Sequence, residues 1–256
     1  MRYEGTTALV TGASSGIGAE FARRLAHQGA DIVAVARRSD ALEELAEGIR
    51  SECGRRVQVV PFDLSVDRGG YRLAEQLADA GVRIDTVVNC AGVGLSRALA
   101  DSAEQEIHRQ LRVNVDATVE VSRAFLPQLM ESGAGALVNV ASLTAYMPVP
   151  GMAVYAASKT FVVRFTEALA YETRSTGLTV MALSPGPTAT EFYRTAQAPE
   201  DGVRFQAPEQ VVTAAFRALR RRNPPSSVVS GARNRWIKRL ITAMPKDTVL
   251  RLADSA

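Results

Sequence analysis

Residues 7–18 read TALVTGASSGIG, a short apolar run that leads into a turn with glycines at positions 12, 16 and 18. The run at 7–11 is typical of a buried strand, and the apolar spacing over 18–28 predicts a helix after the turn. Glycines at such a junction let the backbone approach a pyrophosphate, which the N–H groups of the helix can hold. A glycine-rich turn is weak evidence alone, but its place between the first strand and helix predicts a dinucleotide site.

The remainder of the chain alternates strand-like and helical segments. Six further apolar runs predict strands, at 31–36, 57–62, 84–89, 136–141, 178–183 and 227–230. Helical patterns lie between them, for instance at 40–52, 71–80 and 208–222. Nearly continuous apolar runs indicate strands that are buried on both faces, as in a parallel sheet. We therefore expect an α/β fold, a Rossmann-type doubly wound parallel sheet of about seven strands with helices on both faces, in a single domain over 1–256.

Composition and charge place the chain among ordinary globular proteins. Of 256 residues, 46% are hydrophobic and 22% are charged, and the formal net charge is +3. These values exclude a disordered chain, and two cysteines, Cys53 and Cys90, are too few for a disulfide scaffold. Because the first residues also lack an apolar targeting region, we expect a cytoplasmic location. The two histidines, His27 and His108, form no motif with metal-ligand spacing, so no metal is expected.

The end of the second predicted strand indicates which dinucleotide binds. An acidic residue is usual there, roughly 20 residues after the glycine turn, where its carboxylate holds a free ribose 2′-hydroxyl. Here the strand ends at Ala36 and is followed by Arg37 and Arg38. Guanidinium groups bind phosphate dianions in a forked arrangement, so the pair predicts a preference for NADP(H) over NAD(H). The alternative is that both arginines are solvated loop charges.

Three polar residues farther along the chain indicate the chemistry. Tyr155 and Lys159 stand at positions i and i+4, which places both on one face of a helix. A free phenol has a pKa of about 10, and we expect the neighbouring ammonium to lower it toward the working range. Ser142 follows the fifth predicted strand, at the carboxyl edge of the sheet, where open α/β folds bind ligands. Each residue also has an ordinary packing or solvation role, but their combined occurrence favours proton transfer.

Together these motifs resemble those of the short-chain dehydrogenase/reductase family. The resemblance runs from about Thr6 to Thr190 and consists of Thr-Gly-x-x-x-Gly-x-Gly at 11–18, Asn-x-Ala-Gly at 89–92, Asn114, Ser142, Tyr-x-x-x-Lys at 155–159 and Pro185-Gly186. Cys90 departs from the pattern, because many members carry a second asparagine there. The resemblance implies an enzyme that transfers hydride between a nicotinamide cofactor and a carbonyl or secondary alcohol.

The resemblance also implies roles for individual residues. Tyr155 is expected to be the general acid in reduction, with Lys159 lowering its pKa and holding the nicotinamide ribose. Ser142 would donate a hydrogen bond to the substrate oxygen, and Asn114 would help to hold a water that relays protons through Lys159. Thr188 would face the nicotinamide carboxamide. The full set expected at the cofactor comprises Gly12, Ser14, Ser15, Gly16, Ile17, Gly18, Arg37, Arg38, Asp63, Leu64, Asn89, Ala91, Gly92, Tyr155, Lys159, Pro185, Gly186 and Thr188.

Substrate choice is expected to lie in residues 190–256, which we predict to form a substrate lid and a C-terminal extension. Residues 191–201 are predicted to be a mobile lid, since substrate must enter beside Tyr155. Apolar side chains after Ser142 and on this lid favour an apolar or lipid-like ketone or aldehyde, although core packing explains some of them equally well. They are Leu143, Tyr146, Met147, Val149, Met152, Phe192 and Tyr193.

The C-terminal part of the chain carries an excess of positive charge. Residues 217–251 contain ten Arg or Lys and one acid, Asp247, which leaves 20 basic and 26 acidic residues elsewhere. Five apolar residues fall at helical spacing within this segment, Trp236, Ile237, Leu240, Ile241 and Met244. A basic amphipathic helix can lie on an anionic membrane or receive a phosphate-bearing acyl carrier. The alternative is that its apolar face packs on the sheet or on a second subunit.

Other functions are weighed against the same residues. Within the enzyme class, the alternative is a 3-oxoacyl thioester reductase that acts on an acyl carrier. A non-catalytic NADP(H)-sensing module is a different class, but a sensor has no need of the four catalytic candidates together. Nucleic-acid binding is not expected, because no RNA-binding aromatic motif accompanies the basic segment. The long helices expected around Asn114 and Tyr155 resemble the family's subunit contacts, which predicts a homodimer or homotetramer.

Overall fold

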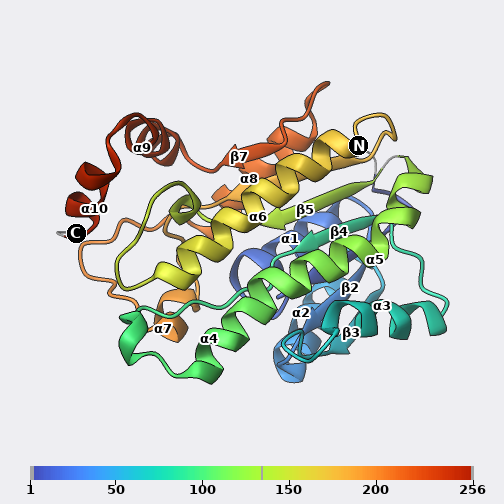
Figure 1. Cartoon of the computed structure of the whole chain (residues 1–256). Coiled ribbons are helices and arrows are strands. Elements are labelled where there is room, and N and C mark those ends of the chain that lie inside the picture. Colours follow the sequence, from blue (N-terminus) through green and yellow to red (C-terminus); the bar gives the residue numbers. More distant parts are fainter. Residues whose placement is uncertain (1–2, 134, 255–256) are drawn as a thin grey trace.

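The computed structural model describes residues 3–133 and 135–254 (Figure 1). Seven parallel strands form one sheet in the order β3-β2-β1-β4-β5-β6-β7. They are β1 (Thr7–Thr11), β2 (Asp31–Ala36), β3 (Val57–Pro61), β4 (Thr86–Asn89), β5 (Ala136–Val140), β6 (Thr179–Ser184) and β7 (Ser227–Val229). The predicted Rossmann-type sheet is confirmed. Residues 1 and 256, the limits of the predicted domain, lie outside the described residues.

Helices connect the strands and follow the last one. They are α1 (Gly16–His27), α2 (Ser39–Cys53), α3 (Gly69–Asp79), α4 (Glu104–Leu111), α5 (Ala117–Ser132), α6 (Ala153–Glu172), α7 (Phe192–Ala196), α8 (Pro208–Leu219), α9 (Ala232–Ala243) and α10 (Lys246–Asp254). Two short 3-10 turns, η1 (Leu99–Asp101) and η3 (Leu143–Tyr146), and a π-helical turn, η2 (Arg112–Asp116), complete the described elements. Each predicted strand and helix corresponds to one of these, with its ends shifted by a few residues.

The strand order reverses at β1. The chain runs outward through β2 and β3 and then returns to place β4 on the other side of β1. Thr11 at the end of β1 is level with Asn89 at the end of β4. The glycine-rich turn after β1 and the loop after β4 therefore leave the sheet side by side at its carboxyl edge. In open α/β sheets ligands bind at this switch point, so the topology predicts a site there.

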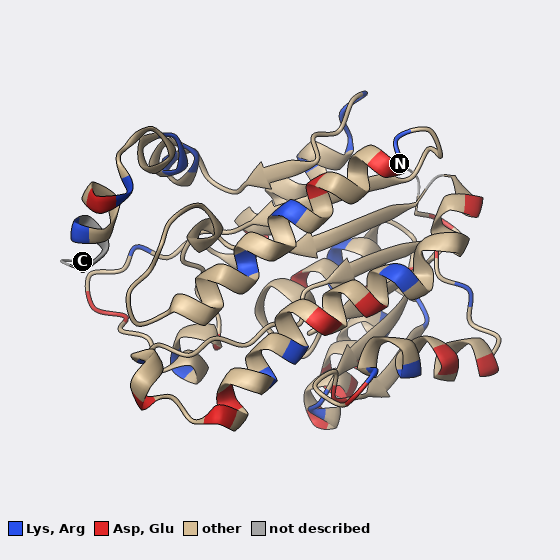
Figure 2. Cartoon of the chain, viewed as in Figure 1, with Lys and Arg blue, Asp and Glu red and all other residues tan. Residues whose placement is uncertain are grey.

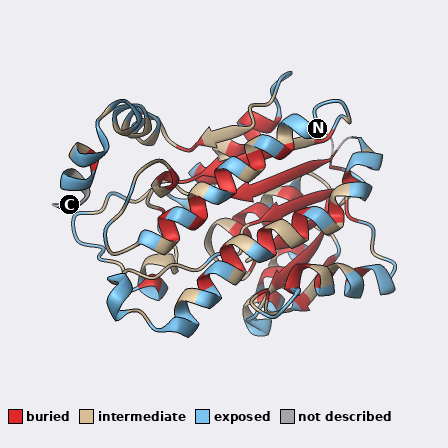
Figure 3. Cartoon of the chain, in the orientation of Figure 1, coloured by how far each residue is buried: buried red, intermediate tan, exposed pale blue. Residues whose placement is uncertain are grey.

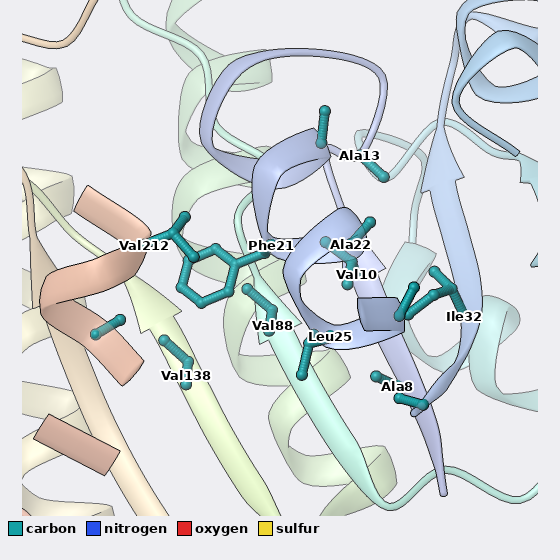
Figure 4. Packing of buried hydrophobic residues seen from close by; sticks show 14 of the residues in the cluster. Ala8, Val10, Ala13, Phe21, Ala22, Leu25, Ile32, Val88, Val138 and Val212 are labelled. Atoms are coloured by element: carbon teal, nitrogen blue, oxygen red, sulfur yellow. The ribbon is translucent and has the colours of Figure 1, made fainter. Parts of the chain in front are cut away.

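Strand β1 illustrates how the core is divided between the two faces of the sheet. Ala8 and Val10 point to one face, where they join a cluster with Phe21 of α1 and Val212 of α8 (Figure 4). Leu9, between them, packs on the other face with residues of α3 and α5. The period of two along a strand produces this alternation, and burial on both faces explains the apolar runs in the sequence. Figure 3 shows the strands as the buried centre of the molecule.

The crossover from β4 to β5 contains a feature that no sequence pattern indicated. Helices α4 and α5 follow one another through the π-helical turn η2. Such turns are rare and occur frequently at functional sites. Asn114, one of the catalytic candidates, lies in this turn and is fully buried.

The C-terminal elements extend from one end of the sheet. The predicted lid, 191–201, contains the one-turn helix α7. In Figure 1, α9 and α10 lie outside the main body of the fold, beyond β7. Helix α9 occupies the segment where the amphipathic helix was expected, and none of its residues is fully buried. Among the described residues, no helix is long and apolar enough to cross a membrane.

Candidate active site

The first turns of α6 carry the phenol and the amine. Tyr155 and Lys159 are only 7% and 4% exposed. The Lys159 ammonium lies 5.8 Å from the centre of the Tyr155 ring, and it donates a hydrogen bond of 3.0 Å to the carbonyl of Val140 at the end of β5. The i,i+4 spacing therefore brings both groups to one side of the helix, at the carboxyl edge of the sheet.

Ser142 reaches the same place from β5. It precedes η3 in an extended conformation, and its Oγ accepts a hydrogen bond of 3.2 Å from the N–H of Thr144. Its hydroxyl also hydrogen-bonds with the phenol of Tyr155, and this bond acts to lower the pKa of the phenol. The two hydroxyl groups that the sequence singled out are thus in contact.

The expectation that Lys159 lowers the pKa of Tyr155 is wrong for this structure. Burial raises the pKa of Tyr155 well above its usual range, and the hydrogen bond with Ser142 only partly opposes this effect. Burial also lowers the pKa of Lys159 to about 8, while the adjacent Cys90 thiol acts to raise it. Both side chains are removed from water, which disfavours phenolate and ammonium alike. The phenol is therefore a protonated donor at neutral pH, and the amine titrates within the physiological range.

Asn114 joins the π-helical turn to α6 and to the loop after β4. Its Nδ2 donates to the carbonyl of Val93 at 2.9 Å and to Oγ of Ser158 at 3.0 Å. Its Oδ1 accepts from the N–H of Val93 at 2.9 Å. A Cβ at Gly92 would lie 3.2 Å from Lys159 Nζ and 3.5 Å from Asn114 Oδ1. Three of the predicted residues therefore meet here, and the amide of Asn114 is occupied within the protein.

The glycine-rich turn has the bare backbone that a dinucleotide requires. Gly12 has a φ of +67°, and a Cβ there would lie 2.8 Å from the backbone nitrogen of Ala91. A Cβ at Gly18 would collide with the carbonyl oxygen of Gly12. The Ser15 side chain caps no N–H group at the start of α1. A cradle that any Cβ would fill, at the N-terminus of a helix, fits the phosphates of a dinucleotide. The remaining predicted residues of the turn are all half-buried: Ser14, Gly16 and Ile17.

Arg37 and Arg38 follow β2, and the structure distinguishes them. Both are exposed. Arg38 forms an ion pair of 2.6 Å with Glu191 and donates to the carbonyl and the hydroxyl of Ser14 at 3.3 Å. Within residues 3–133 and 135–254, Arg37 forms no ion pair. Arg38, although exposed, therefore has defined partners and links the glycine turn to the predicted lid.

The predicted residues after β3 and β4 have partners of their own. Asp63 accepts hydrogen bonds from the N–H and the hydroxyl of Ser65, and Leu64 is buried. The amide of Asn89 donates to Ser122 and Asn139 in the interior. Its side chain therefore stabilises the centre of the fold.

The segment after β6 closes the same edge of the sheet. The Pro185 carbonyl accepts a hydrogen bond of 2.7 Å from the N–H of Leu143, and the Thr188 hydroxyl donates to the Gly186 carbonyl at 2.9 Å. Leu143 and Thr188 are buried. These bonds hold the segment against the turn that begins at Ser142.

The aromatic residues expected around substrate have separate roles. The Tyr146 hydroxyl lies 3.0 Å from Oγ of Ser227, and Leu143 is buried, so core packing accounts for both residues. Phe192 of α7 lies on Tyr155, with 5.1 Å between ring centres. Tyr193 packs edge-on against Phe205 at 4.8 Å. The lid helix thus places an aromatic wall directly on the phenol.

Two residues of this site were missed by reasoning from the sequence. Glu191 was counted only as part of the lid, yet it binds Arg38, which is 153 positions away. Ser158 lies inside the Tyr-x-x-x-Lys motif and bonds to Asn114. Nothing in the local pattern marks Glu191, whereas Ser158 follows from a helix that buries one face at 155, 158 and 159.

The chain is similar to known proteins over most of its length. The family model described as short chain dehydrogenase matches residues 6–201. Sulfoacetaldehyde reductase 2 of Chromohalobacter salexigens is 37% identical over 186 residues, 72% of this chain and 73% of that protein. A 7beta-hydroxysteroid dehydrogenase of Clostridium sardiniense is 34% identical over 74% of this chain and 72% of its own length.

Solved structures agree. A short-chain dehydrogenase from Sphingobium yanoikuyae in complex with NADPH superposes with a TM-score of 0.81 at 30% identity, over 94% of this chain and 96% of that one. Structures with this fold contain NADP(H) in some cases and NAD in others. The chain therefore belongs to the short-chain dehydrogenase family of oxidoreductases, which act on alcohol and carbonyl groups.

Proposed function

We propose that the chain reduces an apolar ketone or aldehyde with NADPH, or oxidises the corresponding alcohol with NADP⁺. The observation that carries this proposal is the group formed by the half-buried Ser142 and the buried Tyr155 and Lys159 beside the bare glycine turn. It brings a hydrogen-bond donor, an acid and a titratable amine to the edge where a dinucleotide fits. When bound, the nicotinamide supplies or accepts the hydride, and the protein supplies placement, protons and electrostatics.

In this proposal Tyr155 is the general acid in reduction. Because burial keeps its pKa high, the phenol is protonated at neutral pH and can donate to a carbonyl oxygen as charge develops there. Ser142 donates a second hydrogen bond to that oxygen and orients the phenol. Lys159, with a pKa of about 8, returns a proton to the phenolate and holds ribose hydroxyl groups. The amide of Asn114 is occupied within the protein and its backbone carbonyl accepts a hydrogen bond of 2.9 Å from the Thr118 hydroxyl, so a relaying water would have to share that carbonyl with Thr118.

The preference for NADP(H) rests on the two arginines after β2. Arg38 already lies against Ser14 of the glycine turn, and Arg37 has no acidic partner among the described residues. A 2′-phosphate would therefore meet two guanidinium groups. Substitution Arg37→Asp should weaken NADPH binding by about 10- to 100-fold and leave NADH binding little changed. Fluorescence titration of both nucleotides tests this, and an unchanged NADPH-to-NADH ratio would refute it.

The proposed substrate class follows from the aromatic wall that the lid places on Tyr155. Phe192 offers apolar surface beside the phenol, Tyr193 packs against Phe192, and Phe205 packs against Tyr193. Of the relatives, the hydroxysteroid dehydrogenase is named for a bulky apolar alcohol and the sulfoacetaldehyde reductase for a small charged aldehyde, so neither substrate is transferred by similarity alone.

The decisive experiment measures NADPH oxidation against ketones, aldehydes and carrier-linked 3-oxoacyl thioesters graded by chain length. Turnover that rises with the chain length of free ketones supports the proposal. Turnover only with carrier-linked thioesters favours the acyl-carrier reductase. Tight NADPH binding without turnover of any compound favours the sensing module. The Tyr155→Phe protein provides the blank for each measurement.

Assembly and location complete the proposal. Leu111, Met130 and Phe161 are exposed on α4, α5 and α6, the helices that carry or adjoin Asn114 and Tyr155. Contact between two copies of the chain would cover these three side chains, in keeping with the expected homodimer or homotetramer. Light scattering would measure the mass of the assembly. A cytoplasmic location stays a prediction from the sequence.

A further inference from the structure

A basic groove separates α9 from α8. It has a volume of about 1580 Å³, and it is lined by Arg217 of α8, by Arg221 just after this helix, and by Arg233, Arg235, Lys238 and Arg239 of α9. Glu209 is the single acid among the lining residues. None of these six cations forms an ion pair with a described residue. Figure 2 shows the basic residues gathered on α9.

The outer side of α9 is apolar. Trp236 is 64% exposed and Leu240 is 49% exposed, and their i,i+4 spacing places them on the same face. Arg233 and Arg239 stand three residues before and after Trp236, so they flank this face on its two sides. A tryptophan and a leucine between arginines is the arrangement of a helix that lies in a lipid–water interface.

The inner side of α9 is fixed to the segments around the candidate site. Asn234 lies against Gly186, where a Cβ would collide with its amide. The Lys238 ammonium lies 4.1 Å from the centre of the Tyr146 ring, in the turn after Ser142. Because the inner face is anchored in this way, the exposed tryptophan is held outward, on the side of the helix that faces away from these segments.

We propose that α9 docks on the surface of an anionic lipid bilayer, with Trp236 and Leu240 in the interface and the groove arginines on the lipid headgroups. Charge and apolar exposure together favour this occupant. A nucleic acid or an acidic protein would match the cations but leave the tryptophan without a role. A second copy could cover the tryptophan, but two-fold pairing of this face would bring its arginines together.

Membrane docking would also supply substrate to the active site, an inference that rests on the proposed function. A bilayer bound to the outer side of α9 would lie one helix away from Gly186 and the turn after Ser142, which contact the inner side. An apolar ketone dissolved in the membrane could then pass to the aromatic wall without crossing water. Docking itself requires no catalysis, so the two proposals can fail separately.

The test uses the full chain, whose single tryptophan is Trp236. We expect it to sediment with phosphatidylglycerol-containing vesicles and not with pure phosphatidylcholine, and raised salt should release it. Trp236 emission should shift to the blue on binding, and brominated lipid should quench it. No sedimentation, or equal binding to both vesicles, would overturn the proposal. So would binding without a change in Trp236 emission.

Matched variants locate the surface. Arg235→Glu/Arg239→Glu should reduce vesicle affinity by about 30-fold or more, whereas Arg72→Glu/Arg123→Glu, with the same net charge, should not. Trp236→Ala/Leu240→Ala should also weaken binding, unlike Leu99→Ala/Tyr171→Ala at exposed sites elsewhere. If an α9 double variant and its control lost vesicle affinity equally, the assignment would be overturned. It would also be overturned if Trp236→Ala/Leu240→Ala changed only the oligomeric mass and not vesicle binding.

Activity separates the two proposals. NADPH oxidation with a water-soluble ketone should be unchanged in the α9 variants. Vesicle binding without turnover of any carbonyl compound would leave docking in place and refute the reductase. Turnover without vesicle binding would refute docking alone.

Discussion

The carboxylate of Glu191 lies 2.6 Å from the guanidinium of Arg38, so the first residue of the lid is tied to the residue expected to hold a 2′-phosphate. Glu191 also bonds with Ser15 of the glycine turn, and Arg38 holds its pKa below the usual range. Thr190 adds a contact, because a Cβ at Gly16 would lie 2.6 Å from its methyl group. The lid and the glycine turn are therefore joined across the crevice.

Removing this carboxylate should favour NADPH. A phosphate that binds Arg38 must displace the carboxylate of Glu191. Glu191→Gln should therefore lower the Kd for NADPH by about 2- to 5-fold, which corresponds to the free energy of an exposed ion pair, and leave the Kd for NADH unchanged. Glu167→Gln, which breaks the exposed pair with Arg164 on α6, is the control. Calorimetric titration measures both nucleotides, and equal tightening of NADPH and NADH would show that the pair does not compete with phosphate.

Loss of the phenol should stop chemistry and spare binding. Tyr155→Phe keeps the ring against Phe192 but removes the proton donor. Turnover should fall by about 100-fold or more while the Kd for NADPH stays within about twofold. Tyr171→Phe, at an exposed position on the same helix, should retain full activity. Retained turnover in Tyr155→Phe would mean that another group protonates the substrate.

The pH dependence of reduction should report Lys159. Its pKa is lowered to about 8, so the amine is charged below that pH and neutral above it. Because the charged form returns the proton and holds the ribose, kcat/KM for reduction should fall as pH rises through about 8. Lys159→Met should lower activity and remove this fall of kcat/KM with rising pH. A profile of the unaltered protein that stays flat to about pH 9.5 would contradict the role.

Two glycine substitutions should have opposite effects on stability. Gly12→Ala forces an alanine to a φ of +67° and brings its Cβ within 2.8 Å of Ala91, which should cost about 2–4 kcal/mol. Gly48→Ala lies inside α2 with nothing within 4 Å of the new Cβ, so it should stabilise by about 1 kcal/mol. Urea unfolding compares them, and a stable Gly12→Ala protein would show that the turn tolerates a side chain.

Several features could be predicted because they are local. The strands follow from short apolar runs, and the glycine turn from the conformations that only glycine adopts easily. Tyr155 and Lys159 share a face because helix geometry fixes the i,i+4 relation. The basic amphipathic pattern of Trp236, Ile237, Leu240, Ile241 and Met244 likewise predicted a helix, although which side would be covered stayed open.

The sequence by itself therefore determined the alternation of strands and helices, the bare turn and the pairing of phenol with amine, since each depends on residues a few positions apart. Tertiary structure alone decided that Glu191 meets Arg38, that Phe192 covers Tyr155 and that Trp236 faces outward. It also reversed the expected pKa of Tyr155. Contacts over such separations depend on where crossovers return the chain, and the cost of burying a charge depends on everything packed around it.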